Sequence, residues 1–286
     1  MRKIFTALLM ICLCEFGFAK ILGENNISEN IVSEMILEGE FNKAAQKISE
    51  NPNLSSEVLL NLIFTYPYKN SEAKQNINRF IGEHKFDLNR LFSDNGEDIT
   101  IFYLLILMPI NIDEKIELME TIIKNGYDLS KPVVKSDEYA LSPLAVVVQN
   151  EEHDSEHFRR IFDFLVDKKA SPDMALNFLL NKKIGANIDE FNKTQIDEID
   201  KRLKSAEFAK NRQKYQPWVD EIFDNYELSD FDGSEVFFAA YEYILMNDFE
   251  GLKKLIDKGF KEIPGIVAHT INESPKNRDE ILKLLQ

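Results

Sequence analysis

The segment Ile116–Leu129, IELMETIIKNGYDL, decides the fold because it joins a helical stripe of apolar residues to a helix end. Apolar side chains recur at spacings of three and four, at Ile116, Met119, Ile122 and Ile123. This period predicts an amphipathic helix rather than a strand. Gly126 and the residues after it mark the loop that follows.

The same helix end returns elsewhere in the chain. Residues 126–130, Gly-Tyr-Asp-Leu-Ser, repeat residues 85–89, Lys-Phe-Asp-Leu-Asn, at an offset of 41. Leu165-Val166 precedes Lys169-Ala170 in the same way, and Leu255-Ile256 precedes Lys258-Gly259-Phe260. Self-similarity at such a spacing indicates a repeat architecture.

The starts of the preceding apolar helices repeat as well. Thr100-Ile101-Phe102 corresponds to Ser142-Pro143-Leu144 at an offset of 42. Each unit therefore reads as a buried helix, a turn, an amphipathic helix and a loop. One such pair cannot cover its own apolar face, so neighbouring pairs must stack. The sequence predicts an all-α solenoid of stacked helix pairs.

This pattern resembles the ankyrin-repeat family, whose unit opens with Thr-Pro-Leu-His and closes with a Leu-Leu-x-x-Gly-Ala-Asp-like helix end. Residues 142–145, Ser-Pro-Leu-Ala, and 122–128, Ile-Ile-Lys-Asn-Gly-Tyr-Asp, carry the resemblance. It covers residues 30–180 and 235–286. The motif histidine is missing, and the spacing of 41 to 43 exceeds the family's ~33. A helical-pair repeat of another family is the alternative fold.

Residues 187–226 depart from the repeat. Their apolar residues lie on one helical stripe among many charges, at Ile188, Phe191, Ile196, Ile199, Leu203 and Phe208. The stripe predicts a long amphipathic helix, either a stretched repeat or an insertion, whose apolar face packs on the core. Pro217 is expected to interrupt this helix before Trp218.

The first 19 residues have the composition of a secretory signal peptide. Arg2 and Lys3 precede an apolar run of 11 residues, and cleavage is predicted after Ala19. Residues 20–286 would form a single helical-repeat domain, located in a periplasm or outside the cell. Both cysteines of the chain, Cys12 and Cys14, belong to the predicted leader. The mature chain would therefore have no disulfide and no cysteine-bound metal.

A second apolar segment, Ile99–Ile112, contains 14 residues and includes Pro109. This is too short to span a bilayer, so a buried helix is predicted. We expect no stable membrane insertion once the leader is removed.

The net charge of the chain limits the classes of molecule that it is expected to bind. The chain carries 34 basic and 49 acidic residues, for a formal net charge of −15. An acidic chain repels phosphate backbones and anionic lipid surfaces, which argues against nucleic-acid binding. A basic protein partner is expected, with the chain itself a monomer and with no cofactor.

One motif would place the chain among enzymes. His153-Asp154-Ser155-Glu156-His157 fits the His-x-x-Glu-His pattern, in which two imidazoles on one helical face bind zinc and Glu156 acts as the base. No apolar flank precedes the motif, and the expected structure is a solvated turn at a helix start. A metal-dependent hydrolase using His153, Glu156 and His157 stays the alternative function, beside a structural protein of the cell envelope.

Two acidic loops have the composition of calcium loops. Residues 93–98 and 230–235 each place Gly at the sixth position of an EF-hand, but Leu91 and Leu228 then occupy the first. That position requires an oxygen ligand. Ordinary turns are therefore expected, with Ser234 capping the next helix.

The sequence favours a non-enzymatic interaction module, because the loop tips of a repeat stack can vary without harming its core. The expected contact loops are 94–98, 131–139 and 228–234, with Tyr139 and Phe231 as aromatic anchors. The predicted binding residues are Asp94, Asn95, Glu97, Asp98, Asp137, Glu138, Tyr139, Asp230, Phe231 and Asp232. By analogy with exported ankyrin-like proteins, an immunity or inhibitor protein is one concrete form of this function.

Overall fold

The computed structural model describes residues 27–94, 96–152, 155–185, 205–245, 248–261 and Lys283. Over these residues the chain is mostly helical and carries a small antiparallel sheet. It divides into two compact units, residues 1–128 with 133–140 and residues 129–132 with 141–286. The predicted signal peptide, residues 1–19, lies outside the described residues.

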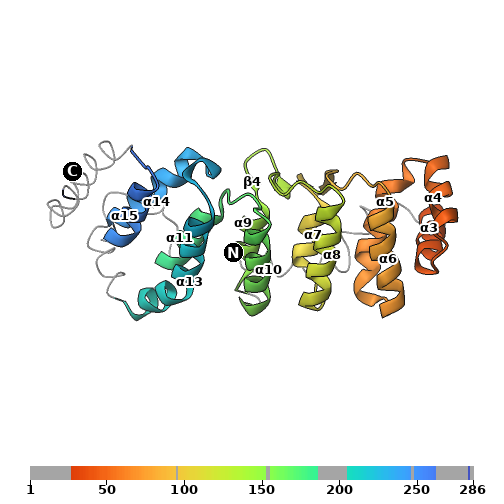
Figure 1. Cartoon of the computed structure of the whole chain (residues 1–286), viewed down its shortest axis with the longest axis horizontal. Helices are drawn as coiled ribbons and strands as arrows, with labels where there is room; N and C mark the ends of the chain where they lie inside the picture. The colour runs from red at the N-terminus through yellow and green to blue at the C-terminus, as the bar shows by residue number, and fades with distance from the viewer. Residues whose placement is uncertain are drawn as a thin grey trace. The chain divides into compact units, whose positions relative to one another are not determined.

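The first unit is built from helix pairs that pack in chain order (Figure 1). Helix α3 packs on α4, α5 and α6, while α5 contacts α7 and α6 contacts α8. The elements are α3 (Ile27–Leu37), α4 (Phe41–Glu50), α5 (Leu54–Thr65), η2 (Tyr66–Tyr68), α6 (Ser71–Glu83), β1 (Phe92–Asp94), β2 (Glu97–Ile99), α7 (Ile101–Leu107), α8 (Ile112–Lys124) and β3 (Val134–Lys135).

The second unit follows the same scheme. Helix α9 packs on α10 and α11, α11 also packs on α13 and α14, and α14 packs on α15. The elements are α9 (Pro143–Asn150), α10 (Ser155–Asp167), α11 (Ala175–Ile184), α13 (Ala206–Asn225), η4 (Leu228–Asp230), α14 (Gly233–Leu245) and α15 (Phe249–Asp257); strand β4 (Ala140–Leu141) leads into this unit.

The two predicted helix starts are equivalent in the structure. Thr100 caps α7, with its hydroxyl accepting from the backbone N–H of Tyr103, and Ser142 caps α9 by accepting from the N–H of Ala145. A hydroxyl at this position satisfies one of the helix's free amide donors. Every residue of α9 from Pro143 to Val148 is buried, as expected of the inner helix of a pair.

The helix ends repeat one hydrogen-bond pattern. After α8, the N–H of Tyr127 donates to the carbonyl of Ile122, and the N–H of Gly126 donates to that of Ile123. The same two bonds close α3 at Gly39-Glu40, α10 at Lys169-Ala170 and α15 at Gly259-Phe260. This is the Schellman arrangement, which needs a left-handed residue at its turn. The self-similarity of the sequence therefore reflects a repeated cap.

Helix α6 ends differently, although its sequence suggested the same end. His84 follows the helix in extended conformation, and its N–H donates to the carbonyl of Phe80. The aromatic rings of Phe80, His84 and Phe86 pack against one another at this end. Ring packing takes the place of the left-handed turn.

Replacing Gly126 or Gly259 by alanine should destabilise the chain by about 1–2 kcal/mol, since left-handed backbone carries that penalty for a residue with a Cβ. Their φ angles are +105° and +101°, and a Cβ at either position would meet no atom within 4 Å. The cost is therefore one of backbone conformation alone. Urea unfolding at equilibrium measures it.

Gly82→Ala is the matched control. Gly82 lies inside α6, where an added Cβ would make only an ordinary 3.7 Å contact with Asn125. Alanine there should stabilise by about 0.5–1 kcal/mol through its better helix propensity. Equal effects at Gly82 and Gly126 would contradict the assigned caps.

The prediction of an all-α chain is wrong in one respect, because short strands occupy two of the loops. The sheet order is β1-β2-β3-β4, with β1–β2 and β2–β3 antiparallel. Each strand has only two or three residues, so no alternating pattern is long enough to be recognised.

The apolar segment 99–112 contains the end of β2, helix α7 and the start of α8. Helix α7 is buried, as predicted.

Pro217 does not interrupt its helix, contrary to the sequence prediction. It lies inside α13, which runs unbroken from Ala206 to Asn225. An internal proline costs ~3 kcal/mol, and burial of the surrounding apolar side chains offsets this. Trp218 is 4% exposed, in contact with Phe162, and Phe208 is buried as predicted. Ile188, Phe191, Ile196, Ile199 and Leu203 lie outside the described residues.

Within the part of the chain that the structure describes, no helix combines the length and the apolar character needed to cross a bilayer.

Candidate functional site

Two of the three predicted binding loops come together in the first unit. Strand β2 pairs with β1 on one side and with β3 on the other, which places Asp98 opposite Lys135. The loop after β3 carries Asp137, Glu138 and Tyr139, all exposed. Strands of a sheet lie about 4.8 Å apart, so side chains of the two loops form one surface. We call this surface, made of Glu97, Asp98, Asp137, Glu138 and Tyr139, the acidic rim.

A direct contact joins the two loops of the acidic rim. The Tyr139 hydroxyl donates a short hydrogen bond to the Glu97 carboxylate. Ser93 donates to Asp98 at 2.5 Å, while the backbone N–H groups of Glu138 and Tyr139 donate to Ser136 Oγ at 3.2 Å. The Tyr139 side chain is nevertheless 40% exposed. The rim therefore presents an aromatic ring and two carboxylates, those of Glu97 and Asp98, that are held by hydrogen bonds.

Asp94 and Asn95 belong to the tip between β1 and β2. Asp94 pairs through its backbone with Glu97, and Gly96 has a φ of +89°, as the turn requires. Asn95 lies outside the described residues. The pairing of Asp94 with Glu97 and the conformation of Gly96 agree with the predicted turn.

The third predicted loop belongs to the second unit, and Phe231 there is not the surface anchor that the sequence suggested. Its side chain is 7% exposed, with ring contacts to Phe223 and Tyr226. Asp230 and Asp232 are exposed, and each accepts a backbone hydrogen bond that holds the loop, from Glu227 and Ser234 respectively. Asp232, rather than Ser234, therefore caps α14.

The zinc hypothesis gains no support from geometry. Glu156 and His157 lie in the first turn of α10, and the His157 ring contacts Phe158. His153 lies outside the described residues. Over the described part of the chain, no three His, Cys, Asp or Glu side chains form a group able to hold a metal ion.

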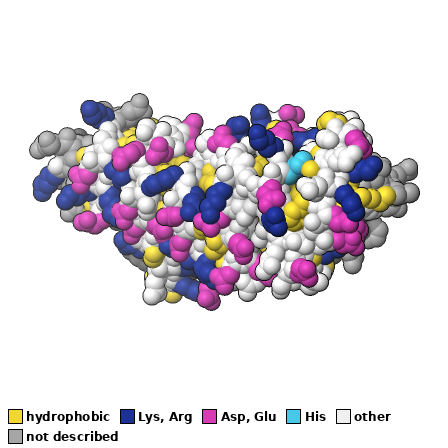
Figure 2. All heavy atoms as spheres, turned by 45° about the vertical axis from the view of Figure 1, so that its right-hand side comes forward, with side chains coloured by type: hydrophobic (Ala, Val, Ile, Leu, Met, Phe, Trp, Pro, Cys, Tyr) yellow, Lys and Arg dark blue, Asp and Glu magenta, His cyan; other side chains and the backbone are white. Residues whose placement is uncertain are grey.

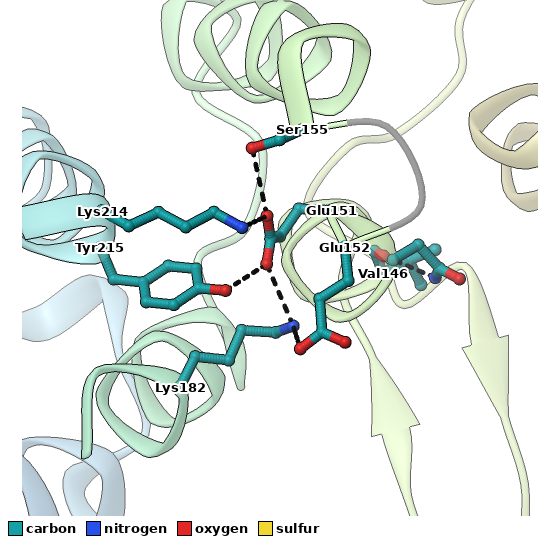
Figure 3. Close-up of polar contacts among 8 residues, drawn as sticks. Val146, Glu151, Glu152, Ser155, Lys182, Lys214 and Tyr215 are labelled. Carbon is teal, nitrogen blue, oxygen red and sulfur yellow. Dashed lines mark hydrogen bonds and ion pairs between the residues drawn. The ribbon is translucent and has the colours of Figure 1, made fainter. Parts of the chain in front are cut away.

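A buried ionic network in the second unit was missed by sequence reasoning (Figure 3). The Glu151 side chain, at the end of α9, is 0% exposed. Tyr215 donates to it at 2.5 Å, and Lys214 and Lys182 lie 2.7 and 3.3 Å away. Ser155 donates at 3.3 Å from the start of α10. One carboxylate thus links α9, α10, α11 and α13.

The surroundings of Glu151 fix its charge. Burial alone raises its pKa, but the hydrogen bonds from Lys214 and Tyr215 and the charges of Lys182 and Lys214 outweigh burial, so the pKa falls below 4.5. Burial and the bond to Glu151 raise the pKa of Tyr215, which stays a donor. No local pattern reveals this network, because Lys182 and Tyr215 lie 31 and 64 residues from Glu151.

Helix α14 brings further carboxylates into the core. Glu235 and Glu242 are each 1% exposed; the backbone N–H groups of Met174 and Asn177 approach Glu235, whereas the Glu242 oxygens accept no hydrogen bond from the described residues. Asp248, at the start of α15, is paired with the buried Lys183 of α11 at 2.8 Å. Burial raises the pKa of Glu242 well above its usual value, with the Lys183 charge opposing the shift. These groups form no recognisable catalytic arrangement.

Glu235→Gln should remove a pH dependence of stability. Burial, followed by the charge of Asp173, raises the pKa of Glu235 from 4.5 to about 8. Between those values the folded chain holds a proton that the unfolded chain has lost, so stability falls as pH rises. Wild type should lose about 2–4 kcal/mol more than the variant between pH 5 and pH 8.

Trp218 fluorescence during urea unfolding reports on this unit, since the tryptophan is buried there. Glu250→Gln, at an exposed position of α15, is the control and should follow wild type. Identical pH profiles for wild type and Glu235→Gln would contradict the assignment.

Charge on the surface is mixed rather than uniform. Figure 2 shows acidic and basic side chains interspersed over the face that it displays. Local groups of carboxylates, such as the acidic rim, therefore matter more for recognition than the net charge of −15.

Comparison of the chain with protein-family models, with curated proteins and with solved structures finds no match.

Proposed function

We propose that this chain is a non-enzymatic interaction module, a stack of ankyrin-like helix pairs that binds a basic protein partner. The repeated caps support the repeat assignment, since the same two backbone bonds close α3, α8, α10 and α15. A hairpin between helix pairs suits such a module, because loops can carry specificity on a rigid scaffold.

The acidic rim is the observation that carries the binding function. It combines exposed carboxylates with a half-exposed Tyr139 whose hydroxyl is held by Glu97. Aromatic side chains held in place lose little conformational entropy on binding, and surrounding charges steer an oppositely charged partner. A partner with a basic patch matches this surface.

The leader predicted at residues 1–19 supports export, and we propose that the mature chain begins at Lys20 and acts in a periplasm or outside the cell. An immunity or inhibitor protein for a basic toxic effector is the concrete form of this proposal. Mass spectrometry of the exported protein tests it. An N-terminus at Lys20 is expected, and an intact Met1–Ala19 segment would reject export through this leader.

The binding test uses the double variant Asp137→Lys/Glu138→Lys. The full-length processed protein is used to isolate its dominant partner from an envelope fraction, and affinity is then measured by calorimetry at several salt concentrations. Reversal of two rim charges should weaken binding at least about tenfold and reduce its salt dependence.

Glu34→Lys/Glu38→Lys is the matched control, with the same change in net charge in the same unit. Both residues are exposed and lie at or just after the end of α3. This control should bind within about twofold of wild type, because distant charges are screened. Equal loss in both double variants would show that only net charge matters and would reject the acidic rim as the binding site.

A further inference from the structure

The outer face of helix α14 carries two exposed phenylalanines. Ser234, Phe237, Phe238 and Tyr241 share this face, at spacings of three and four. Phe237 and Phe238 are each 38% exposed, while Tyr241 is partly exposed. We call these four residues the α14 face.

The two phenylalanines form a preorganised pair. Their ring centroids lie 6.1 Å apart with an interplanar angle of 85°, an edge-to-face contact. The other large exposed apolar side chains of the described residues, Ile31, Tyr68, Leu91 and Tyr139, do not include a second pair of adjacent residues. Isolated exposed apolar residues are ordinary, whereas a contiguous aromatic patch indicates a binding surface.

The inner side of α14 holds the pair in place. Val236, Ala239, Ala240, Tyr243 and Ile244 are buried on that side, so the helix cannot rotate to hide Phe237 and Phe238 without exposing these residues. Phe231, buried against Phe223 and Tyr226, fixes the loop that leads into the helix. The exposure of the two rings is therefore a stable feature of this unit.

Carboxylates border the N-terminal end of the α14 face. Asp232 directly precedes the helix, and Phe237 lies four residues after Gly233, a rise of about 6 Å. Hydrogen bonds from Ser234 keep the pKa of Asp232 low, so the carboxylate is ionised at neutral pH. Asp230 is held by the N–H of Glu227 at 2.8 Å. The patch thus combines two aromatic rings with two oriented negative charges.

Two lysines of this unit are hydrogen-bonded at the end of α13. Lys169 donates to the carbonyl of Asn225 at 2.7 Å, and Lys258 donates to that of Tyr226 at 2.9 Å. Both cations satisfy carbonyl groups at the end of α13, a position where positive charge is favourable. They are held at that helix end.

We propose that the α14 face binds a cationic amphipathic helix of a partner protein. Its apolar side packs on Phe237 and Phe238, and its Lys or Arg side chains meet Asp230 and Asp232. Helix recognition commonly uses apolar anchors at spacings of three and four. A second copy of this chain is disfavoured, because pairing two such faces would bring together like charges on molecules of net charge −15.

This inference rests on the proposed function only for the sign of the partner's charge, and it concerns a different surface from the acidic rim.

The probe is a synthetic 18-residue helical peptide with leucine on one side and lysine on the other, carrying a fluorescent label. Anisotropy titration with the intact processed protein measures its affinity at low and high salt. Two comparison peptides have glutamate in place of lysine, or the same composition in scrambled order.

We expect the Leu/Lys helix to bind at least about tenfold more tightly than either comparison peptide. Phe237→Ser/Phe238→Ser should weaken binding at least tenfold. Asp230→Asn/Asp232→Asn, which keeps acceptors for the two loop hydrogen bonds, should weaken it severalfold and reduce its salt dependence. Tyr68→Ser removes an aromatic side chain that is 82% exposed in the first unit and should change nothing.

Unchanged peptide affinity in Phe237→Ser/Phe238→Ser, with Trp218 fluorescence showing a native fold, would overturn the proposal. Equal binding of the scrambled peptide would also overturn it. A wild-type dimer in sedimentation equilibrium that this variant abolishes would assign the face to a second copy instead. The rim variant Asp137→Lys/Glu138→Lys should keep its affinity for the peptide, which separates failure of the acidic rim from failure of the α14 face.

Discussion

Glu151→Ala should lower the free energy of unfolding of the second unit by about 3 kcal/mol, because it leaves buried partners without their acceptor. Tyr215 would lose a bond of 2.5 Å, Lys214 would lose the carboxylate that it pairs with, and Lys182 would keep only the exposed Glu152. Both lysine side chains are partly exposed to water. The loss of unfolding free energy should therefore be smaller than for a fully buried ion pair. Urea unfolding followed by Trp218 fluorescence measures it.

Glu152→Ala is the matched control for Glu151→Ala. Glu152 is the next residue along the chain, carries the same charge and also pairs with Lys182, but its side chain is 54% exposed. An exposed pair of this kind contributes little, so the control should stay within about 0.5 kcal/mol of wild type. Equal losses in the two variants would show that Glu151 acts as an ordinary surface charge.

The pH dependence gives a second test of Glu151. Its pKa lies below 4.5 in the folded chain, so the folded state favours the charged form. This stabilisation is complete above the unfolded pKa and is lost as pH falls through the folded pKa. Wild type should therefore lose more stability than Glu151→Gln when pH falls from 6 to 3.5. Parallel losses would refute the assignment.

Gly251→Ala should destabilise the second unit by about 2–3 kcal/mol, although alanine is the better helix former. A Cβ at this position of α15 would lie 2.5 Å from Cδ1 and 2.8 Å from Cζ of Tyr243. The Tyr243 ring is 1% exposed and sits beside the Lys183 ammonium at 5.3 Å, so it has no free space to enter. Thermal and urea unfolding measure the loss.

A double-mutant cycle identifies the clash as the cause. In a Tyr243→Leu background the clashing ring atoms are gone, and Gly251→Ala should become neutral or stabilise by about 0.5–1 kcal/mol. Gly233→Ala, at the start of α14 with no atom within 4 Å of an added Cβ, is the single-site control and should not destabilise. If Gly251→Ala costs as much in the Tyr243→Leu background, the ring is not responsible.

Local features of the fold could be predicted where their cause is local. The helix end at Gly126 follows from residues within one turn, and so do the caps at Thr100 and Ser142. Lys169 occupies the same turn position with a φ of +56°, which residue type alone would not suggest. Lys169 aligns with Gly126 and Gly259 in the sequence repeat, and this alignment is the signal from which its left-handed conformation could be predicted.

Features that depend on distant residues could not be predicted. Glu151 and Glu152 look alike in the sequence, and only the lysines and the tyrosine of later helices distinguish the buried carboxylate from the exposed one. Pro217 shows the same limit, because its penalty is local while the burial that offsets it comes from packing. The acidic rim lies between these cases: its residues were predicted, but the bond from Tyr139 to Glu97 spans 42 positions.

The repeated helix cap has a consequence for how this chain can evolve. Each cap closes with bonds that span no more than six consecutive residues, so the cap itself does not depend on a neighbouring pair. Insertion or deletion of a pair would leave these caps intact, but it would have to restore the bonds between neighbouring loops, such as the one from the Ser171 N–H to the Leu129 carbonyl. A change of length by one helix pair would therefore keep the helix ends and alter the contacts between neighbouring loops.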